Sequence, residues 1–262
     1  MKKANRVLTV LMFIFLYIPM AVLIVASFNT GKDITNFEGF TLQRYVELFH
    51  DDHLLNLLRN SLIISVISTA VATAFGTVAA VGIHNLKPKL RKVVMSLTNI
   101  PMTNPDIVTG VSLSLLFVFV GTKMLGQRDA LTFWTLLIAH ITFSLPYVIL
   151  NVMPKLMQMD RSLTDAAMDL GCTPRQAFFK VILPEIMPGV VTGSLLAFTM
   201  SLDDFVISYF TSSTDQNLSM IVYSAARRGI EPTMYALSTL MFLSILVLLL
   251  VVNRRSSLEE MR

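Results

Sequence analysis

Three carboxylates lie within long apolar runs of the sequence, at Asp106, Asp203 and Asp204. An acidic side chain near the middle of a bilayer costs roughly 2.5 to 3.5 kcal/mol on insertion scales, so such groups usually face a cavity or a partner. We interpret at least one of the three as lining a transport pathway. The alternative for each is a structural hydrogen bond or a position near the outer surface.

The apolar runs are long enough for helices of about 20 residues that cross a bilayer. The chain is 54% hydrophobic and 15% charged, whereas soluble proteins carry about 25% charged residues. This composition excludes a soluble enzyme, a disulfide-stapled secreted domain and a disordered chain. The net charge of +4 is too small and too scattered to indicate nucleic acid as a partner.

We predict an all-α integral membrane protein with a single transmembrane domain over residues 1–262. Its six predicted transmembrane helices cover residues 7–28, 62–83, 93–120, 131–152, 186–210 and 234–252. The first is interpreted as a retained anchor, because its apolar core is long for a signal peptide and no convincing cleavage site follows.

Two of the predicted helices carry features that bear on the carboxylates. Pro101 and Pro105 should bend or break the third helix between residues 99 and 106. Broken backbone at membrane depth needs protein or water around it. On the fifth helix, Asp203 and Asp204 would be neighbours about 100° apart, so both cannot point straight into one pore.

The distribution of Lys and Arg predicts the orientation, because cytoplasmic segments carry an excess of both. If the amino terminus is cytoplasmic, fourteen of the 21 Lys and Arg fall on inner segments and seven on outer loops. We therefore predict that both termini are cytoplasmic. The outer segment 29–61 should be partly helical around residues 43–58.

The inner loop 153–185 has the signals of two short helices. Thr173 and Gln176 have the spacing of a capping box, with Pro174 at the first helical position. Gly171 is the residue type that ends a helix in a left-handed turn. The pattern predicts a helix before Gly171 and another after Thr173.

The same loop resembles the EAA motif of binding-protein-dependent ABC importer permeases. That pattern is Glu-Ala-Ala, three residues, Gly, nine residues and Ile-x-Leu-Pro, and the spacing here matches it throughout. The matching residues are Asp165, Ala166, Ala167, Gly171, Val181, Leu183 and Pro184. Asp replaces Glu at the first position and Val replaces Ile. The resemblance implies that this loop is a coupling helix that docks in a cleft of an ATP-binding subunit.

Three further tracts are similar to those of the second permease subunit of spermidine/putrescine importers, at residues 104–108, 139–146 and 201–208. The resemblance implies a type I ABC importer permease that translocates polyamines across the bacterial cytoplasmic (inner) membrane. It also implies the partners: a second homologous permease, two ATP-binding subunits, an extracytoplasmic substrate-binding protein and membrane lipid. ATP and Mg would be held by the ATP-binding subunits, and no cofactor by this chain.

The sequence lacks the motifs of an enzyme, with no phosphate-cradling G-x-x-x-x-G-K-[ST] loop, zinc signature or nucleophile elbow. His50-Asp51-Asp52-His53 could bind a divalent metal, but a solvated helix start is the favoured interpretation and no metal site is predicted. His140 is interpreted as a hydrogen-bonded packing residue. Gly189 and Gly193 form a G-x-x-x-G that would permit close helix contact.

Three other functions remain open at this point. An ion-coupled secondary carrier would use the intramembrane carboxylates as an ion site, but it leaves the inner loop unexplained and shows no inverted repeat. An ABC permease for a different small solute would have the same loop. A structural membrane scaffold would leave the buried carboxylates unexplained.

Overall fold

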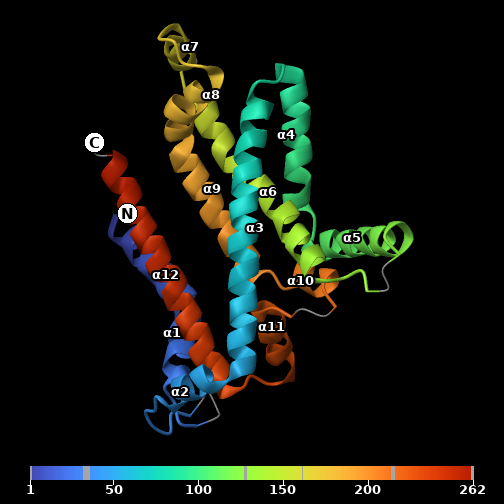
Figure 1. Ribbon diagram of the computed structural model, residues 1–262. Helices are drawn as coiled ribbons and strands as arrows, with labels where there is room; N and C mark the ends of the chain where they lie inside the picture. The colour runs from blue at the N-terminus through green and yellow to red at the C-terminus, as the bar shows by residue number, and fades with distance from the viewer. Residues whose placement is uncertain (1, 32–35, 127–128, 161, 214–215, 261–262) are drawn as a thin grey trace. The chain divides into compact units, whose positions relative to one another are not determined.

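The computed structural model describes residues 2–31, 36–126, 129–160, 162–213 and 216–260, and side chains between residues 6 and 250 except 228, 248 and 249 (Figure 1). The described residues form helices joined by turns and loops, with an isolated β-bridge between Asn29 and Phe40. The chain divides into two compact units. The terminal unit comprises Met1–Asn56 and Val222–Arg262, and the central unit comprises Leu57–Ile221.

The terminal unit is built from α1 (Lys2–Ser27), α2 (Gln43–His50) and α12 (Pro232–Glu260), with α12 packed against both α1 and α2. Arg44 of α2 is buried and donates hydrogen bonds to the carbonyl oxygens of Asn29, at 2.6 Å, and Gly31. These bonds tie the segment after α1 to α2. The predicted helical structure around residues 43–58 is confirmed, since α3 begins at Asp52.

The central unit carries the remaining helices. They are α3 (Asp52–His84) from Leu57 onward, α4 (Pro88–Thr103), α5 (Asp106–Phe119), α6 (Phe133–Gln158), α7 (Ser162–Asp169), α8 (Pro174–Ala177), α9 (Leu183–Asp203), α10 (Val206–Thr211) and the start of α11 (Leu218–Arg228). Two π-helical segments extend them, η1 (Val120–Met124) after α5 and η2 (Phe178–Ile182) before α9.

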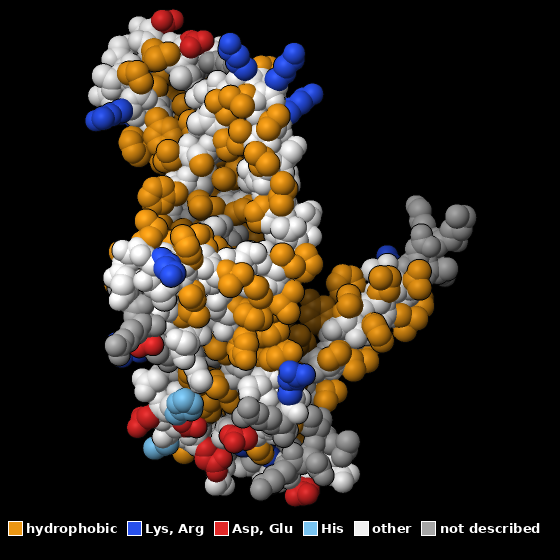
Figure 2. Space-filling view, turned by 90° about the vertical axis from the view of Figure 1, so that its right-hand side faces the viewer, with side chains coloured by type: hydrophobic (Ala, Val, Ile, Leu, Met, Phe, Trp, Pro, Cys, Tyr) orange, Lys and Arg blue, Asp and Glu red, His pale blue; other side chains and the backbone are white. Residues whose placement is uncertain are grey.

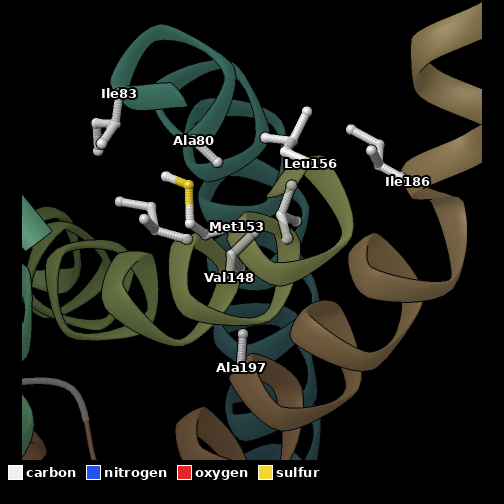
Figure 3. Packing of buried hydrophobic residues seen from close by; sticks show 9 residues of the cluster. Ala80, Ile83, Val148, Met153, Leu156, Ile186 and Ala197 are labelled. Carbon is white, nitrogen blue, oxygen red and sulfur yellow. The ribbon is translucent and has the colours of Figure 1, made fainter. Parts of the chain in front are cut away.

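The core of the central unit lies between α3, α6 and α9 (Figure 3). Its buried side chains are Ala80, Ile83, Val148, Ile149, Val152, Met153, Leu156, Ile186 and Ala197. The G-x-x-x-G of α9 lies in the contact with α6, since a Cβ on Gly189 would stand 2.7 Å from the carbonyl oxygen of Asn151. The close helix contact expected of this motif is therefore present, and the absence of side chains there permits it.

Among the described residues, five helical stretches are long and apolar enough to cross a membrane by length and composition. They are Arg6–Ser27, Asp52–His84, Asp106–Met124, Phe133–Gln158 and Pro174–Asp203. The predicted sixth span falls on α12, whose apolar stretch is the shorter Pro232–Val247. The count of six spans and the cytoplasmic position of both termini therefore stay predictions.

Two predicted spans are interrupted. The predicted break in the third is confirmed: α4 ends at Thr103 and α5 begins at Asp106, with Pro105 between them. The prediction of a continuous fifth helix over residues 186–210 is wrong, because α9 ends at Asp203 and α10 begins at Val206. Asp204 has an extended backbone, with φ −67° and ψ 120°, so the two carboxylates are not neighbours on one helix.

Candidate functional site

The inner loop folds as two short helices joined at Gly171. Gly171 has a φ of +87°, in the left-handed region, and the N–H of Cys172 donates to the carbonyl oxygen of Ala167 at 3.1 Å. Thr173 and Gln176 form the predicted capping box: Thr173 N–H donates to Gln176 Oε1 at 2.9 Å, and Gln176 N–H to Thr173 Oγ1 at 3.4 Å. Both helices and the left-handed glycine agree with the sequence prediction.

The surface of this loop is partly apolar. Leu170 is 87% exposed, and Leu163 and Met168 beside it are also exposed. Exposed apolar side chains gathered in this way are typical of a surface that another protein covers. Among the residues of the EAA-like motif, Ala167 is buried, Val181 and Leu183 are half-buried, and Asp165, Ala166, Gly171 and Pro184 are exposed.

The start of α7 is stabilised by Asp160, whose Oδ1 accepts the N–H of Ser162 at 2.9 Å. Hydrogen bonds from Ser162 hold the pKa of the Asp160 carboxyl below its usual range. The carboxylate therefore stays ionised at physiological pH. An ionised acceptor near a helix N-terminus is favourable because the peptide dipoles there present positive charge.

Basic side chains gather at the same end of the central unit as α7 and α8 (Figures 1 and 2). Lys87, Lys89 and Lys92 lie in and after the turn between α3 and α4 and are exposed. Many hydrophobic side chains are exposed on the face seen in Figure 2. The turn between α3 and α4 and the α7–α8 loop thus lie at one end of the central unit, and the cytoplasmic position of that end stays a prediction.

The three candidate carboxylates have different surroundings. Asp106 is the first residue of α5 and Asp203 the last of α9, and both are exposed. The side chain of Asp204 is only 6% exposed. Its Oδ1 accepts Ile207 N–H at 3.2 Å, and its Oδ2 accepts Ser208 N–H at 2.9 Å. The carboxylate of Asp204 thus stabilises the start of α10.

Asp106 lies near the break between α9 and α10. Helix α5, which begins at Asp106, packs against α10, and Tyr147 of α6 packs against a buried cluster that includes Ile207 of α10. The ring of Tyr147 packs edge-to-face on Phe143, with centroids 5.4 Å apart. Exposed carboxylates and an aromatic ring are the groups that can stabilise an ammonium ion in place of water.

Sequence reasoning missed a buried hydrogen-bond network around His140. The imidazole is 1% exposed and lies 2.7 Å from Ser201 Oγ through Nδ1 and 2.9 Å from Ser208 Oγ through Nε2. The interpretation of His140 as a hydrogen-bonded packing residue is confirmed. Its partners Ser201 and Ser208 are polar residues within apolar runs of the sequence. Their position in those runs is the signal that could have identified them.

The His50-Asp51-Asp52-His53 tract is a helix start. Asp51 Oδ1 accepts the N–H groups of His53 and Leu54, each at 3.0 Å, and thereby caps α3. In the part of the chain that the structure describes, no group of three or more His, Cys, Asp or Glu is placed to hold a metal ion.

Comparisons with known proteins agree with this geometry. Residues 72–255 match the family model described as binding-protein-dependent transport system inner membrane component. The chain is 40% identical over 238 residues to the putrescine transport system permease protein PotI of Escherichia coli K12, covering 89% of this chain and 84% of that protein. It is 36% identical over 239 residues to the spermidine/putrescine transport system permease protein PotC of the same strain, covering 91% and 88%.

Solved structures show the same fold. A chain of a bacterial ABC transporter that imports alginate has a TM-score of 0.75 at 19% identity, covering 97% of this chain and 94% of that one. A chain of the MetNI methionine ABC transporter has a TM-score of 0.60 at 20% identity, covering 76% and 92%. The match to the family model and the identity to PotI and PotC show that the protein belongs to the family of inner membrane components of binding-protein-dependent transport systems.

Proposed function

We propose that this chain is the membrane permease subunit of an ATP-driven importer and translocates polyamines. The observation that carries the proposal is the α7–Gly171–α8 loop. It combines the spacing of the EAA motif with a left-handed glycine and an exposed apolar surface. The polyamine assignment is supported by the names of the relatives, which are a putrescine permease and a spermidine/putrescine permease.

The proposed partners follow from the loop and from the relatives. Two ATP-binding subunits dock on α7 and α8 and on the corresponding loop of a second, homologous permease. An extracytoplasmic binding protein delivers substrate to the outer face. ATP and Mg belong to the ATP-binding subunits, because this sequence has no phosphate-cradling loop.

The coupling loop is continuous with the helix that ends at Asp203. From Pro174 through η2 to Asp203 the chain is helical, a stretch of 30 residues. At 1.5 Å per residue it spans roughly 45 Å, more than the thickness of the hydrocarbon core. When closure of the ATPase dimer moves α8, this helix carries the displacement to the break between α9 and α10.

The substrate side of the proposal rests on Asp106, Asp203 and Asp204. A polyamine carries several ammonium charges and must exchange water for groups that stabilise them. Asp106 and Asp203 are exposed, and we propose them as direct partners of the ammonium groups, with Tyr147 as an aromatic partner. Asp204 has its oxygens bonded to α10 and acts through the backbone.

Purification from native membranes tests the assignment. The tagged chain, extracted in a mild detergent, should bring with it a second permease and a subunit with a phosphate-binding loop. Binding protein loaded with putrescine or spermidine should stimulate ATP hydrolysis by that complex. A chain that purifies alone and catalyses uptake driven by an ion gradient would instead be a secondary carrier.

A further inference from the structure

The buried network around His140 joins four helices of the central unit. Ser68 of α3 and Ser201 of α9 have hydroxyl oxygens 3.0 Å apart, and His140 of α6 connects Ser201 to Ser208 of α10. None of these four side chains is more than 2% exposed. His140 therefore bonds both sides of the break that separates α9 from α10.

The direction of each hydrogen bond follows from the groups around Ser208. Asn217 Oδ1 accepts Met220 N–H at 3.0 Å, so the Asn217 amide nitrogen is the group that lies 2.6 Å from Ser208 Oγ and donates to it. The single hydroxyl hydrogen of Ser208 is directed to Asp204, whose backbone carbonyl oxygen at 3.0 Å and ionised carboxylate oxygen at 3.1 Å can both only accept. Ser208 Oγ must then accept from His140 as well.

This arrangement assigns the tautomer of His140. Its Nε2 carries the hydrogen and donates to Ser208, and its Nδ1 accepts from the hydroxyl of Ser201. Because the hydroxyl hydrogen of Ser201 goes to His140, the 3.0 Å contact between Ser201 and Ser68 has Ser68 as its donor, and the Ser68 hydroxyl shares its hydrogen with the carbonyl oxygen of Ser65 at 3.2 Å. The result is a chain of hydrogen bonds that runs from α3 through α9, α6 and α10 and ends on Asp204.

Further bonds hold the same break. Ser219 Oγ donates to the carbonyl oxygen of Leu202 at 2.7 Å, and Leu218 N–H donates to Ser61 Oγ at 2.8 Å. Asp203 is the last residue of α9 and follows Leu202, whose carbonyl oxygen is held by Ser219. The side chain of Asp203 is exposed. The direction of the Asp203 side chain is thus set by backbone that the network holds.

We propose that His140 is a positioning residue for transport: its Nε2–H bond to Ser208 fixes the α9–α10 break and thereby the place of the Asp203 carboxylate. This role rests on the proposed function only in assigning Asp203 to the substrate path. His140 itself is enclosed and does not touch substrate.

Two amide substitutions separate the two bonds of the imidazole. The amide of Gln reaches the place of Nε2 and can still donate to Ser208, whereas the amide of Asn reaches only the place of Nδ1. His140→Gln should therefore retain the function that His140→Asn loses. Ser208→Ala removes the same bond, together with the bonds of Ser208 Oγ to Asn217 and Asp204, with a smaller change in volume. It carries the test if His140→Asn does not assemble.

Ser144→Ala is the matched control. Ser144 lies one turn after His140 on α6, is fully buried, and its hydroxyl makes no hydrogen bond within the described residues. Ser144→Ala removes a buried hydroxyl, as Ser208→Ala does, but leaves the hydrogen bonds of His140 unchanged. Ser144→Ala should leave polyamine uptake, and the thiol-labelling rate described next, equal to those of the chain without this substitution.

Thiol labelling reports the position of residue 203 without requiring transport. The chain has one cysteine, Cys172, so Cys172→Ser with Asp203→Cys provides a single thiol in this chain, and the label on this chain is measured after the subunits of the complex are separated. The reaction rate with a cationic methanethiosulfonate should change at least about 3-fold in His140→Asn or Ser208→Ala and stay at the reference rate in His140→Gln and Ser144→Ala.

Polyamine uptake by the same His140 variants, measured with the native Asp203 in place, provides the second readout. At equal amounts of assembled complex, His140→Asn should raise the concentration for half-maximal polyamine uptake, and His140→Gln should restore it. Equal labelling rates in all variants, or equal effects of Asn and Gln, would overturn the positioning role. A residue 203 that is unreactive in every background would instead contradict its place in the substrate path, and with it the proposed function.

Discussion

Gly193 of α9 lies so close to Val148 of α6 that a Cβ built on the glycine would stand 3.0 Å from the Val148 Cα. The neighbouring atom is backbone and cannot move aside as a flexible side chain could. The contact between α6 and α9 depends on this approach, and these two helices carry most of the buried core shown in Figure 3.

Substitution of Gly193 should therefore destabilise the protein. Gly193→Ala forces the helices apart, and overpacking of this kind typically costs about 1 to 3 kcal/mol. The melting temperature of the purified complex should fall. Gly82→Ala is the control, because a Cβ at Gly82 meets nothing within 4 Å; its melting temperature should be unchanged or higher. A Gly193→Ala complex as stable as wild type would show that the helices are not packed this closely.

Gly171 should matter for coupling more than for insertion. A Cβ in the left-handed conformation costs roughly 1 to 2 kcal/mol, so Gly171→Val would shift α7 relative to α8. We expect normal membrane insertion but weakened docking of the ATPase and loss of most substrate-stimulated ATP hydrolysis.

Gly171→Asn is the matched variant, because Asn adopts the left-handed conformation more readily than Val. It should retain much of the stimulated hydrolysis that Val loses. Wild-type hydrolysis by an assembled Gly171→Val complex would mean that the loop is only a connector between membrane helices.

The three carboxylates should respond differently to neutralisation. Asp106→Asn and Asp203→Asn remove exposed charges, so assembly should be normal while at least one of them loses most polyamine uptake. Asp204→Asn replaces an acceptor that bonds α10, and a lost hydrogen bond to a charged group costs about 1.5 to 3 kcal/mol. The amount of assembled complex should therefore fall in that variant.

Uptake measured at equal amounts of assembled complex distinguishes these cases. If Asp106→Asn and Asp203→Asn both transport at the wild-type rate, these acids are not partners of the substrate. If Asp204→Asn assembles in full, the bonds from the start of α10 are not needed to hold the break.

The local features of the inner loop could be predicted from the sequence because each depends on residues close in the chain. A left-handed Gly171 and the capping box of Thr173 and Gln176 need only their immediate neighbours. Pro105 likewise marks the break between α4 and α5. The apolar runs indicated the membrane helices by length alone.

The break after Asp203 could not be predicted in the same way. Apolar residues flank it on both sides, and no proline or glycine marks it; Asp203 and Asp204 stand at the break, but an acidic pair does not by itself end a helix. The break is stabilised by side chains from distant segments, such as Ser68 and Ser201, which are 133 positions apart. Helix packing decides which buried polar residues come into contact. Those contacts between distant segments cannot be predicted from the residue pattern of a single sequence.

Uptake of labelled putrescine and spermidine into proteoliposomes tests the importer function most directly. With the second permease, the ATP-binding subunits, ATP inside and loaded binding protein outside, polyamine should accumulate, and a protonophore should not prevent it. This chain alone should neither hydrolyse ATP nor accumulate polyamine, because it lacks a phosphate-binding loop. ATP-driven accumulation by the chain alone, or accumulation that needs an ion gradient and no ATP, would contradict the proposed function.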